Sequence, residues 1–195
     1  AETTRRQYSS VTTFLSRQLG AEVQLAVSDS YESFVERVVA DDYDLALIPP
    51  LSYVKAKARN PGIHLLATAL IKCRSEYSAF ILVRSDDPAA DLYDLKGRRI
   101  AMVSKSSTSG YLLPFASVRS MGVTLEEHFS EVVFAGTHTR AIELLAQGKV
   151  DAAATATGMV AIAKEFNTAS EALRSASFRV VHKSGEAPYD AFCAS

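Results

Sequence analysis

Apolar residues recur along this chain with two alternating spacings. Segments in which they fall three or four residues apart are typical of amphipathic helices, and short continuous apolar runs are typical of buried strands. The first spacing predicts helices at 6–19, 30–39, 51–59, 112–121, 140–147 and 159–166. The apolar runs predict strands at 22–27, 44–48, 63–71, 78–83, 99–103, 132–135, 151–154 and 178–182. This alternation of helix and strand predicts an α/β fold with mostly parallel sheets.

A hydroxyl-rich turn lies between the apolar run that ends at Ser104 and the helix expected from residue 112. The turn reads SSTSG, and its Ser107, Thr108 and Ser109 stand directly before Gly110. Free N–H groups in the first turn of a helix carry partial positive charge, and hydroxyls add further donors. The turn therefore predicts a site for a phosphate-like oxyanion. Serine and threonine also cap ordinary helices, and composition alone favours that interpretation.

Composition excludes several classes of function. The 195 residues include 48% hydrophobic residues and carry a net charge of −1, so one large domain or two small lobes are expected. The near-neutral charge predicts no nucleic-acid or anionic membrane surface. No apolar run approaches the ~20 residues of a membrane span, and the amino-terminal AETTRR is not a signal peptide. A mature extracytoplasmic protein would look the same.

The chemistry-bearing residues predict neither a catalytic site nor a metal or other cofactor. Ser52 and Lys55 match the S-x-x-K motif of penicillin-binding enzymes, but its companion motifs S-D-N and K-T-G are absent. The four histidines lack the spacing of zinc ligands. The two cysteines, Cys73 and Cys193, leave two interpretations open: a disulfide in an oxidising compartment, or two free thiols.

Several longer motifs resemble one known family. The segments SSTSGYLLP and FAGTHTRAIELLAQGKVDAA, together with YDLALIPPLSYVKA and DLYDLKGRRIAMV, are similar to segments of the bacterial phosphate, phosphite and phosphonate solute-binding proteins. The resemblance covers most of the chain. It implies a two-lobed fold of the type II periplasmic-binding kind, located in the periplasm or otherwise outside the cytoplasm.

The resemblance also implies a set of ligand-binding residues. Ser107, Thr108 and Ser109 would hold the oxyanion, and the family's matching histidine, here His138, contacts the phosphoryl oxygens. Tyr77 and Tyr53 are candidates for the walls of the cleft, although core tyrosines would look the same. The family also carries an aspartate at the position of Asp190.

The same likeness implies how the chain is divided. Residues 1–72 would form lobe one, 73–77 a hinge crossing, 78–183 lobe two, and 184–195 a segment returning towards lobe one. In this fold Cys73 and Cys193 fall on the two neighbouring crossing segments. Family members begin with a strand before the first helix and continue beyond the position of Ser195, so the sequence looks trimmed at both ends.

One departure from the family bears on the ligand. Relatives that bind aminophosphonates place a carboxylate shortly after the V-D-A-A strand, and alignment puts Gly158 at that position. A buried ammonium group without a charge partner is costly. Asp190 could replace that carboxylate, but one carboxylate is a weaker partner for an ammonium group than two. We therefore expect a ligand without an amino group: phosphate, phosphite, a simple alkylphosphonate or another small oxyanion.

Three classes of function follow from these patterns. The first is the binding component of an ABC importer, with a membrane permease as its partner. The second is the ligand-sensing domain of a membrane receptor such as a histidine kinase. The third is an enzyme on the same fold, because fold does not fix function. We favour the first, in which the protein binds its ligand without catalysis.

Overall fold

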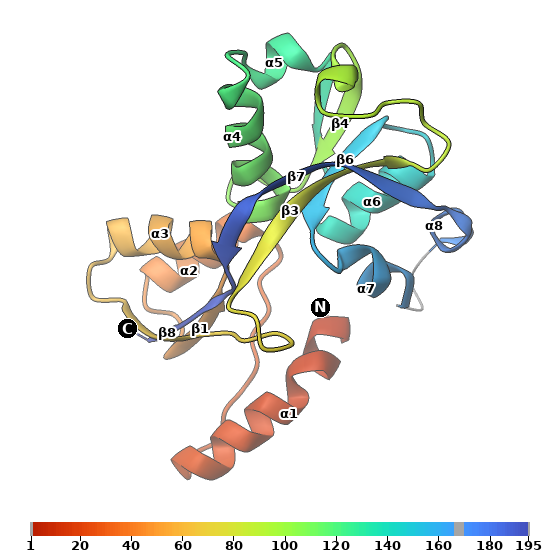
Figure 1. Cartoon of the computed structure of the whole chain (residues 1–195). Coiled ribbons are helices and arrows are strands. Elements are labelled where there is room, and N and C mark those ends of the chain that lie inside the picture. Colours follow the sequence, from red (N-terminus) through yellow and green to blue (C-terminus); the bar gives the residue numbers. More distant parts are fainter. Residues whose placement is uncertain (1, 166–169, 195) are drawn as a thin grey trace.

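The computed structural model describes residues 2–165 and 170–194, and their strands form two separate sheets (Figure 1). The small sheet has the order β1-β8-β2 and the large sheet the order β5-β4-β6-β3-β7. The small sheet comprises β1 (Leu45–Ile48), β2 (His64–Thr68) and β8 (Ala191–Ala194). The large sheet comprises β3 (Glu76–Arg84), β4 (Arg99–Met102), β5 (Glu131–Phe134), β6 (Ala152–Ala156) and β7 (Phe178–Pro188).

The strands run in mixed directions, so the prediction of mostly parallel sheets is wrong. Among the described strands, β4 is parallel to β5 and β6, whereas β3 is antiparallel to β6 and β7, and β8 is antiparallel to β1 and β2. The reason is that β3 carries the chain from the small sheet into the large one and β7 carries it back. Two such crossings run in opposite directions, and the alternation of elements in the sequence does not reveal which strands cross.

The two crossing segments lie side by side. The register of β3 and β7 runs from Glu76 opposite Pro188 to Arg84 opposite Phe178. Before β3, Ile71 and Arg74 exchange backbone hydrogen bonds of 3.0 and 3.1 Å around a tight turn. After β7, only two residues precede β8, so the second of them, Asp190, lies where the two sheets meet.

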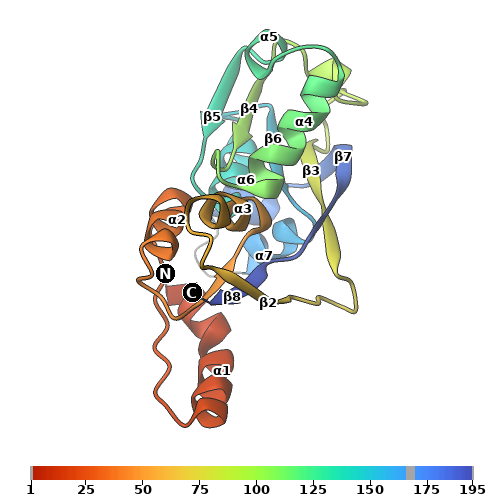
Figure 2. The same cartoon turned by 90° about the vertical axis from the view of Figure 1, so that its left-hand side faces the viewer.

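Helices cover the sheets as shown in Figures 1 and 2. On the small sheet, α2 (Tyr31–Val39) and α3 (Pro50–Arg59) share an apolar cluster with β1 and β8. Above one face of the large sheet lie α4 (Leu113–Ser120) and α5 (Leu125–His128), and α6 (His138–Ala146), α7 (Met159–Glu165) and α8 (Glu171–Ser175) cover the other. Strand β6 alternates between these clusters, because Ala152 and Ala154 face α4 whereas Ala153 faces α6. A short 3₁₀ turn, η1 (Tyr93–Leu95), precedes β4.

The amino-terminal helix α1 (Glu2–Leu19) lies apart from both sheets (Figures 1 and 2). Its Val11, Phe14 and Leu19 are exposed. The extended residues 22–27 that follow pair with no described strand, which corrects the strand predicted there. Their backbone groups instead bond to α1, as in the 2.9 Å hydrogen bond from the Val23 N–H to Ser16 Oγ.

Other differences from the predicted elements concern their ends. Strand β7 continues to Pro188, six residues beyond the predicted end at 182, and β8, α5 and α8 were not predicted. The last residue of the helix predicted at 159–166, Phe166, lies outside the described residues. Both cysteines are free in the structure, with Cys73 exposed and Cys193 buried.

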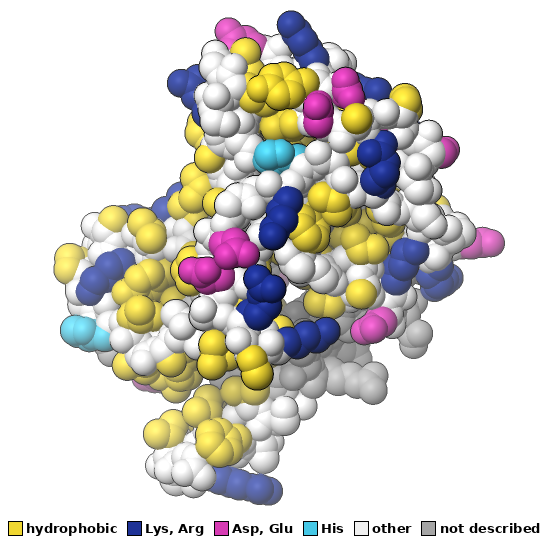
Figure 3. Space-filling model, viewed as in Figure 1, with side chains coloured by type: hydrophobic (Ala, Val, Ile, Leu, Met, Phe, Trp, Pro, Cys, Tyr) yellow, Lys and Arg dark blue, Asp and Glu magenta, His cyan; other side chains and the backbone are white. Residues whose placement is uncertain are grey.

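The surface agrees with the near-neutral composition. Figure 3 shows basic and acidic side chains interspersed on the face that it presents. None of the helices in the described part of the chain is long and apolar enough to span a bilayer.

Candidate functional site

The hydroxyl-rich turn opens a helix earlier than predicted. A π-helical turn, η2 (Thr108–Leu112), runs directly into α4, so the helical segment starts at Thr108 rather than at residue 112. Ser107 is its N-cap, and the Ser107 Oγ accepts a 3.1 Å hydrogen bond from the Gly110 N–H. The hydroxyl side chains of this segment are all buried: Ser104, Ser106, Ser107, Thr108 and Ser109. Buried hydroxyls need partners, so their concentration at a helix N-terminus marks a polar site rather than ordinary core.

Close packing against β4 holds this turn in place. The Val103 N–H donates a 2.9 Å hydrogen bond to the Gly110 carbonyl. A Cβ atom at position 110 would lie 2.3 Å from the Cγ2 of Val103, far inside van der Waals contact. Glycine is therefore required here for space, since its φ lies outside the left-handed region.

Two helices of the small sheet bond directly to this turn of the large sheet. From α3, the Leu51 N–H donates to Thr108 Oγ1 at 2.9 Å and the Ser52 hydroxyl to the Ser106 carbonyl at 3.0 Å. The Lys55 ammonium donates to the Lys105 carbonyl at 2.7 Å and to Ser106 Oγ at 3.0 Å. Ser52 and Lys55 thus both serve this junction, which gives their S-x-x-K spacing a structural role.

From α2, the Glu32 carboxylate accepts a hydrogen bond from the Ser104 hydroxyl. This hydrogen bond is the main cause of a lowered pKa at Glu32. The site is therefore assembled from both sheets, with the hydroxyl turn on one side and the first turns of α2 and α3 on the other.

Two tyrosines lie against the turn. Burial raises the pKa of Tyr77 to about 12, opposed by hydrogen bonding to Ser109 and Thr108. Burial likewise raises the pKa of Tyr31, opposed by hydrogen bonding to Ser107. The Tyr77 ring stacks on Tyr189 with centroids 5.1 Å apart, which fixes its direction. Both phenols are neutral donors at physiological pH.

Asp190 lies on the same side of the junction. Its backbone carbonyl accepts a 3.1 Å hydrogen bond from the Ala69 N–H, which anchors it beside the small sheet. Its carboxylate acts electrostatically on Tyr8, Tyr31 and Tyr77, and its own pKa is raised by burial. A half-buried acid thus faces a group of hydroxyls.

His138 is the first residue of α6, and Thr137 caps that helix. Its Nδ1 lies 3.1 Å from the Oγ1 of Thr155, a fully buried residue of β6. Strand β6 also packs against η2, so His138 is bonded to a strand that contacts the hydroxyl turn. Burial lowers the pKa of His138 to about 4, so the ring is neutral at physiological pH. When Nδ1 accepts from Thr155, Nε2 carries the hydrogen and can donate to an anion.

The lowered pKa of His138 predicts a loss of stability in acid. Between pH 6.5 and about 4 the unfolded chain binds a proton that the folded state does not. The free energy of unfolding should therefore fall, relative to a His138→Gln variant, by about 1.4 kcal/mol for each pH unit in that interval. The raised pKa of Asp190 makes the free energy of unfolding change with pH in the opposite direction, but Asp190 is present in both the wild type and the His138→Gln variant. Urea denaturation of both at several pH values measures this difference, and a difference independent of pH would contradict the burial of a neutral His138.

The structure brings most of the residues predicted from the sequence to one place. Ser107, Thr108, Ser109, Tyr77 and Asp190 interact with one another directly or through Tyr31. His138 is bonded to Thr155 of β6, the strand that packs against this turn.

Tyr53 and Tyr31 lie in different surroundings. The Tyr53 side chain packs against the apolar cluster of the small sheet. Tyr31 was not among the predicted residues. Its only signal in the sequence is an aromatic residue directly after the Ser30 cap of α2, and the sequence does not show that this helix end would face a turn more than seventy residues later.

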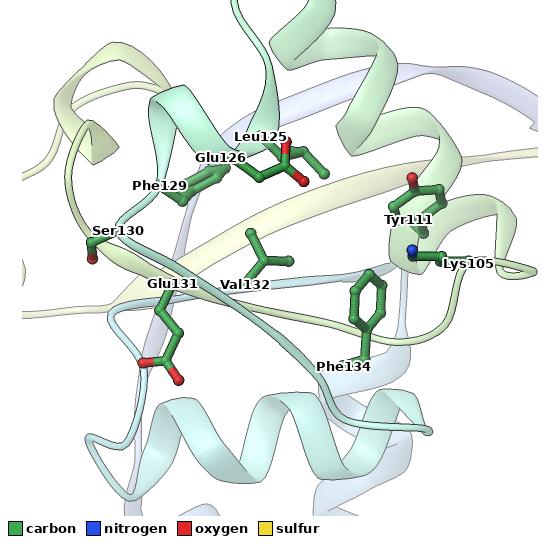
Figure 4. Close-up of a pocket in the computed structure, with 9 residues that line it drawn as sticks. All are labelled: Lys105, Tyr111, Leu125, Glu126, Phe129, Ser130, Glu131, Val132 and Phe134. Carbon is green, nitrogen blue, oxygen red and sulfur yellow. The ribbon is translucent and has the colours of Figure 1, made fainter.

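A separate surface pocket lies beyond the turn, with a volume of about 310 Å³ (Figure 4). It is lined by Lys105, Tyr111, Leu125, Glu126, Phe129, Ser130, Glu131, Val132 and Phe134. None of the hydroxyls of the turn, and neither His138 nor Asp190, belongs to this lining. Because the buried hydroxyls gather at the turn and do not line this pocket, we place the candidate site at the turn. No cluster of acidic, histidine or cysteine side chains in the described segments could hold a metal ion.

Comparisons with known proteins show which family the chain is similar to. A family model described as the periplasmic phosphonate-binding protein of an ABC transporter matches residues 1–195. The phosphate-import protein PhnD of Mycolicibacterium smegmatis is 29% identical over 158 residues, which are 76% of this chain and 49% of that protein. The chain thus spans about half the length of this curated relative.

Two solved structures share the fold. A binding protein component of a phosphonate ABC transporter from Pseudomonas aeruginosa has a TM-score of 0.86 at 20% identity, covering 100% of this chain and 64% of that one. PhnD1 of Prochlorococcus marinus in complex with methylphosphonate has a TM-score of 0.84 at 23% identity, covering 99% and 71%. The type II periplasmic-binding fold expected from the sequence is therefore confirmed, apart from the directions of its strands.

Proposed function

The chain belongs to the periplasmic substrate-binding proteins of phosphonate ABC transporters, and from this we propose that it binds a phosphate, phosphite or simple alkylphosphonate anion between its two sheets. The bound anion would be delivered to a membrane permease for import. Relatives of this family are binding components of transporters rather than enzymes, so the protein binds without turnover.

One observation carries the proposal: the oxygens of two buried hydroxyls already accept hydrogen bonds from backbone N–H groups. Ser107 Oγ accepts from the Gly110 N–H, and Thr108 Oγ1 accepts from the Leu51 N–H. The hydroxyl hydrogens of Ser107 and Thr108 can therefore be donated, either to a neighbouring phenol or to an oxyanion. With the helix N-terminus of η2 behind them, these donors suit a negatively charged, tetrahedral ligand.

The remaining donors complete the proposed set. Tyr31 and Tyr77 would donate from the junction of the sheets, and the Nε2 of His138 would donate from α6. We propose that Ser107, Thr108, Ser109, Tyr31, Tyr77 and His138 contact the phosphoryl oxygens. Tyr53, which packs against the small-sheet core, would act only indirectly.

We also propose that the two sheets belong to lobes that close on the ligand. Lobe one would be residues 1–72, the crossing 73–77, lobe two 78–183 and the return segment 184–195. The paired segments of β3 and β7 and the tight turn at residues 71–74 support this division. Contacts from both sheets to one anion would stabilise the closed form over the open one.

A panel of ligands tests the proposal. The full-length protein is titrated calorimetrically with phosphate, phosphite, ethylphosphonate and aminoethylphosphonate. One or more of the first three anions should bind. Ethylphosphonate should bind at least about tenfold more tightly than its amino analogue, equal to about 1.4 kcal/mol. The reason is that position 158 offers an ammonium group no carboxylate, since it is Gly158, with open space beside it. A clear preference for aminoethylphosphonate would contradict this assignment.

A further inference from the structure

Several hydrogen bonds between the helices of the small sheet and the large sheet use none of the side chains proposed to bind the anion. From α3, the Ser52 hydroxyl donates to the Ser106 carbonyl at 3.0 Å, and the Lys55 ammonium donates to the Lys105 carbonyl at 2.7 Å and to Ser106 Oγ at 3.0 Å. Figures 1 and 2 show α3 below α4, the helix that the hydroxyl turn opens. Ser52 and Ser106 are both buried, so their contact lies inside the junction of the sheets.

The contacts of α3 continue into a contact of α2. The Ser106 N–H donates to Ser104 Oγ at 3.0 Å, and the Ser104 hydroxyl donates to the Glu32 carboxylate. A continuous chain of hydrogen bonds therefore runs from Lys55 through residues 104–106 to Glu32. The ammonium at one end and the carboxylate at the other each strengthen the hydrogen bond that they make. Separation of the two sheets would break this chain at both ends.

Contacts of this kind affect affinity because the lobes must separate before an anion between them can leave. For a protein that is open before it binds, the affinity is that of the open form multiplied by how strongly the loaded protein favours the closed form. A hydrogen bond between the lobes raises this second factor even when it does not touch the ligand.

We propose that Glu32, Ser52 and Lys55 form a latch with residues 104–106 that raises the affinity for the anion without contacting it, an inference that rests on the function proposed above. The hydroxyls of the turn hold the anion, and the latch sets how often the loaded protein opens. Ser52 and Lys55 are positioning residues, and their S-x-x-K spacing places both on the face of α3 that meets residues 105 and 106.

Lys55→Met tests the latch, because methionine keeps most of the length of the side chain and removes both hydrogen bonds. The full-length protein is titrated calorimetrically with methylphosphonate, phosphite and phosphate. Each of these anions that the wild type binds should bind about tenfold more weakly to Lys55→Met, and by the same factor, because the latch does not touch the ligand.

Lys57→Met is the matched control. The Lys57 ammonium donates to the carbonyls of Pro61 and Ile63 at 2.7 and 2.6 Å, so both of its hydrogen bonds stay on the small-sheet side. This variant removes the same charge from the same helix and should keep the wild-type affinity. It therefore separates the loss of the latch from the loss of a positive charge near an anion.

Ser106→Ala removes the acceptor on the other side of the junction without changing any charge. It should weaken binding about threefold, because Lys55 keeps its hydrogen bond to the Lys105 carbonyl. The losses of Lys55→Met and Ser106→Ala should not multiply in the double variant, since both changes remove the same contact.

A distance measurement shows whether these variants act by opening the lobes. Spin labels are placed at Ala58→Cys on α3 and Ser120→Cys on α4, both exposed positions, in a Cys73→Ser background in which the remaining Cys193 is buried. With the tightest-binding of the three anions at saturation, Lys55→Met should add a population at longer distance. The wild type and Lys57→Met should not, whereas a loss of helix stability alone would leave the distances unchanged.

The outcomes separate this inference from the proposed function. An affinity of Lys55→Met within threefold of the wild type would overturn the inference, as would an equal loss in Lys57→Met or a loss that differs between the anions. If Lys55→Met does not fold, Ser106→Ala decides in its place, and a wild-type affinity in that variant would overturn the inference. A wild-type protein that binds none of the three anions would instead overturn the proposed function, and this inference with it.

Discussion

Alanine at position 110 is expected to destabilise the protein by about 3 kcal/mol and to remove measurable oxyanion binding. The added Cβ of Gly110→Ala would lie 2.3 Å from the Cγ2 and 2.4 Å from the Cβ of Val103, and 2.9 Å from the Oγ of Ser107. Val103 is fully buried directly after β4, so it cannot move away without disturbing the sheet. The turn must shift instead, and with it the N-cap and the buried hydroxyls that we propose bind the anion.

Gly185→Ala is the matched control for this experiment. No atom lies within 4 Å of the Cβ position at Gly185, and its φ is outside the left-handed region. Urea denaturation gives the free energy of unfolding of both variants, and calorimetric titration with methylphosphonate gives their affinity. Wild-type values for Gly110→Ala would show that the turn tolerates a side chain and that the close packing on Val103 does not position the site.

The candidate site was largely predictable because its chemistry is local in the sequence. The hydroxyls of residues 107–109 and the glycine that follows are consecutive, so one turn brings them together whatever the rest of the fold does. Their exact role in the helix was not predictable from spacing. The helical segment starts at Thr108 through a π-helical turn, which the apolar pattern from residue 112 onwards does not reveal.

Residues contributed by other elements were harder to assign. Tyr31 and Tyr53 both follow helix-start signals near the amino terminus, and nothing in their local sequence shows which would face the turn. The difference comes from tertiary packing: α2 presents its first residue to Ser107, whereas the ring of Tyr53 packs into the apolar cluster beneath α3.

The directions of the strands could not be predicted from the sequence, for a related reason. Helix and strand signals report local periodicity, and they predicted most of the elements of the large sheet. They carry no information on where the chain crosses between sheets, and here β3 and β7 make both crossings and pair antiparallel. The short β8, inserted between β1 and β2, depends on the same crossing.

The hydroxyls of Ser107 and Thr108 should together supply a large share of the binding free energy. Each hydrogen bond lost to a charged ligand costs ~1.5–3 kcal/mol. The double variant Ser107→Ala with Thr108→Ala should therefore bind methylphosphonate about 10²- to 10⁴-fold more weakly than the wild type. Calorimetric titration at a temperature at which circular dichroism shows both proteins folded measures this loss.

Two variants separate binding from folding in this test. Ser107 also caps η2, and removing a cap costs about 1 kcal/mol of stability. Ser170→Ala removes an equivalent N-cap, that of α8, whose Oγ accepts from the Leu173 N–H at 3.2 Å, and it should leave the affinity unchanged. Thr108→Ser keeps the hydroxyl that accepts from Leu51 and should bind almost as the wild type does. An unchanged affinity in the double variant would exclude these two hydroxyls from the site.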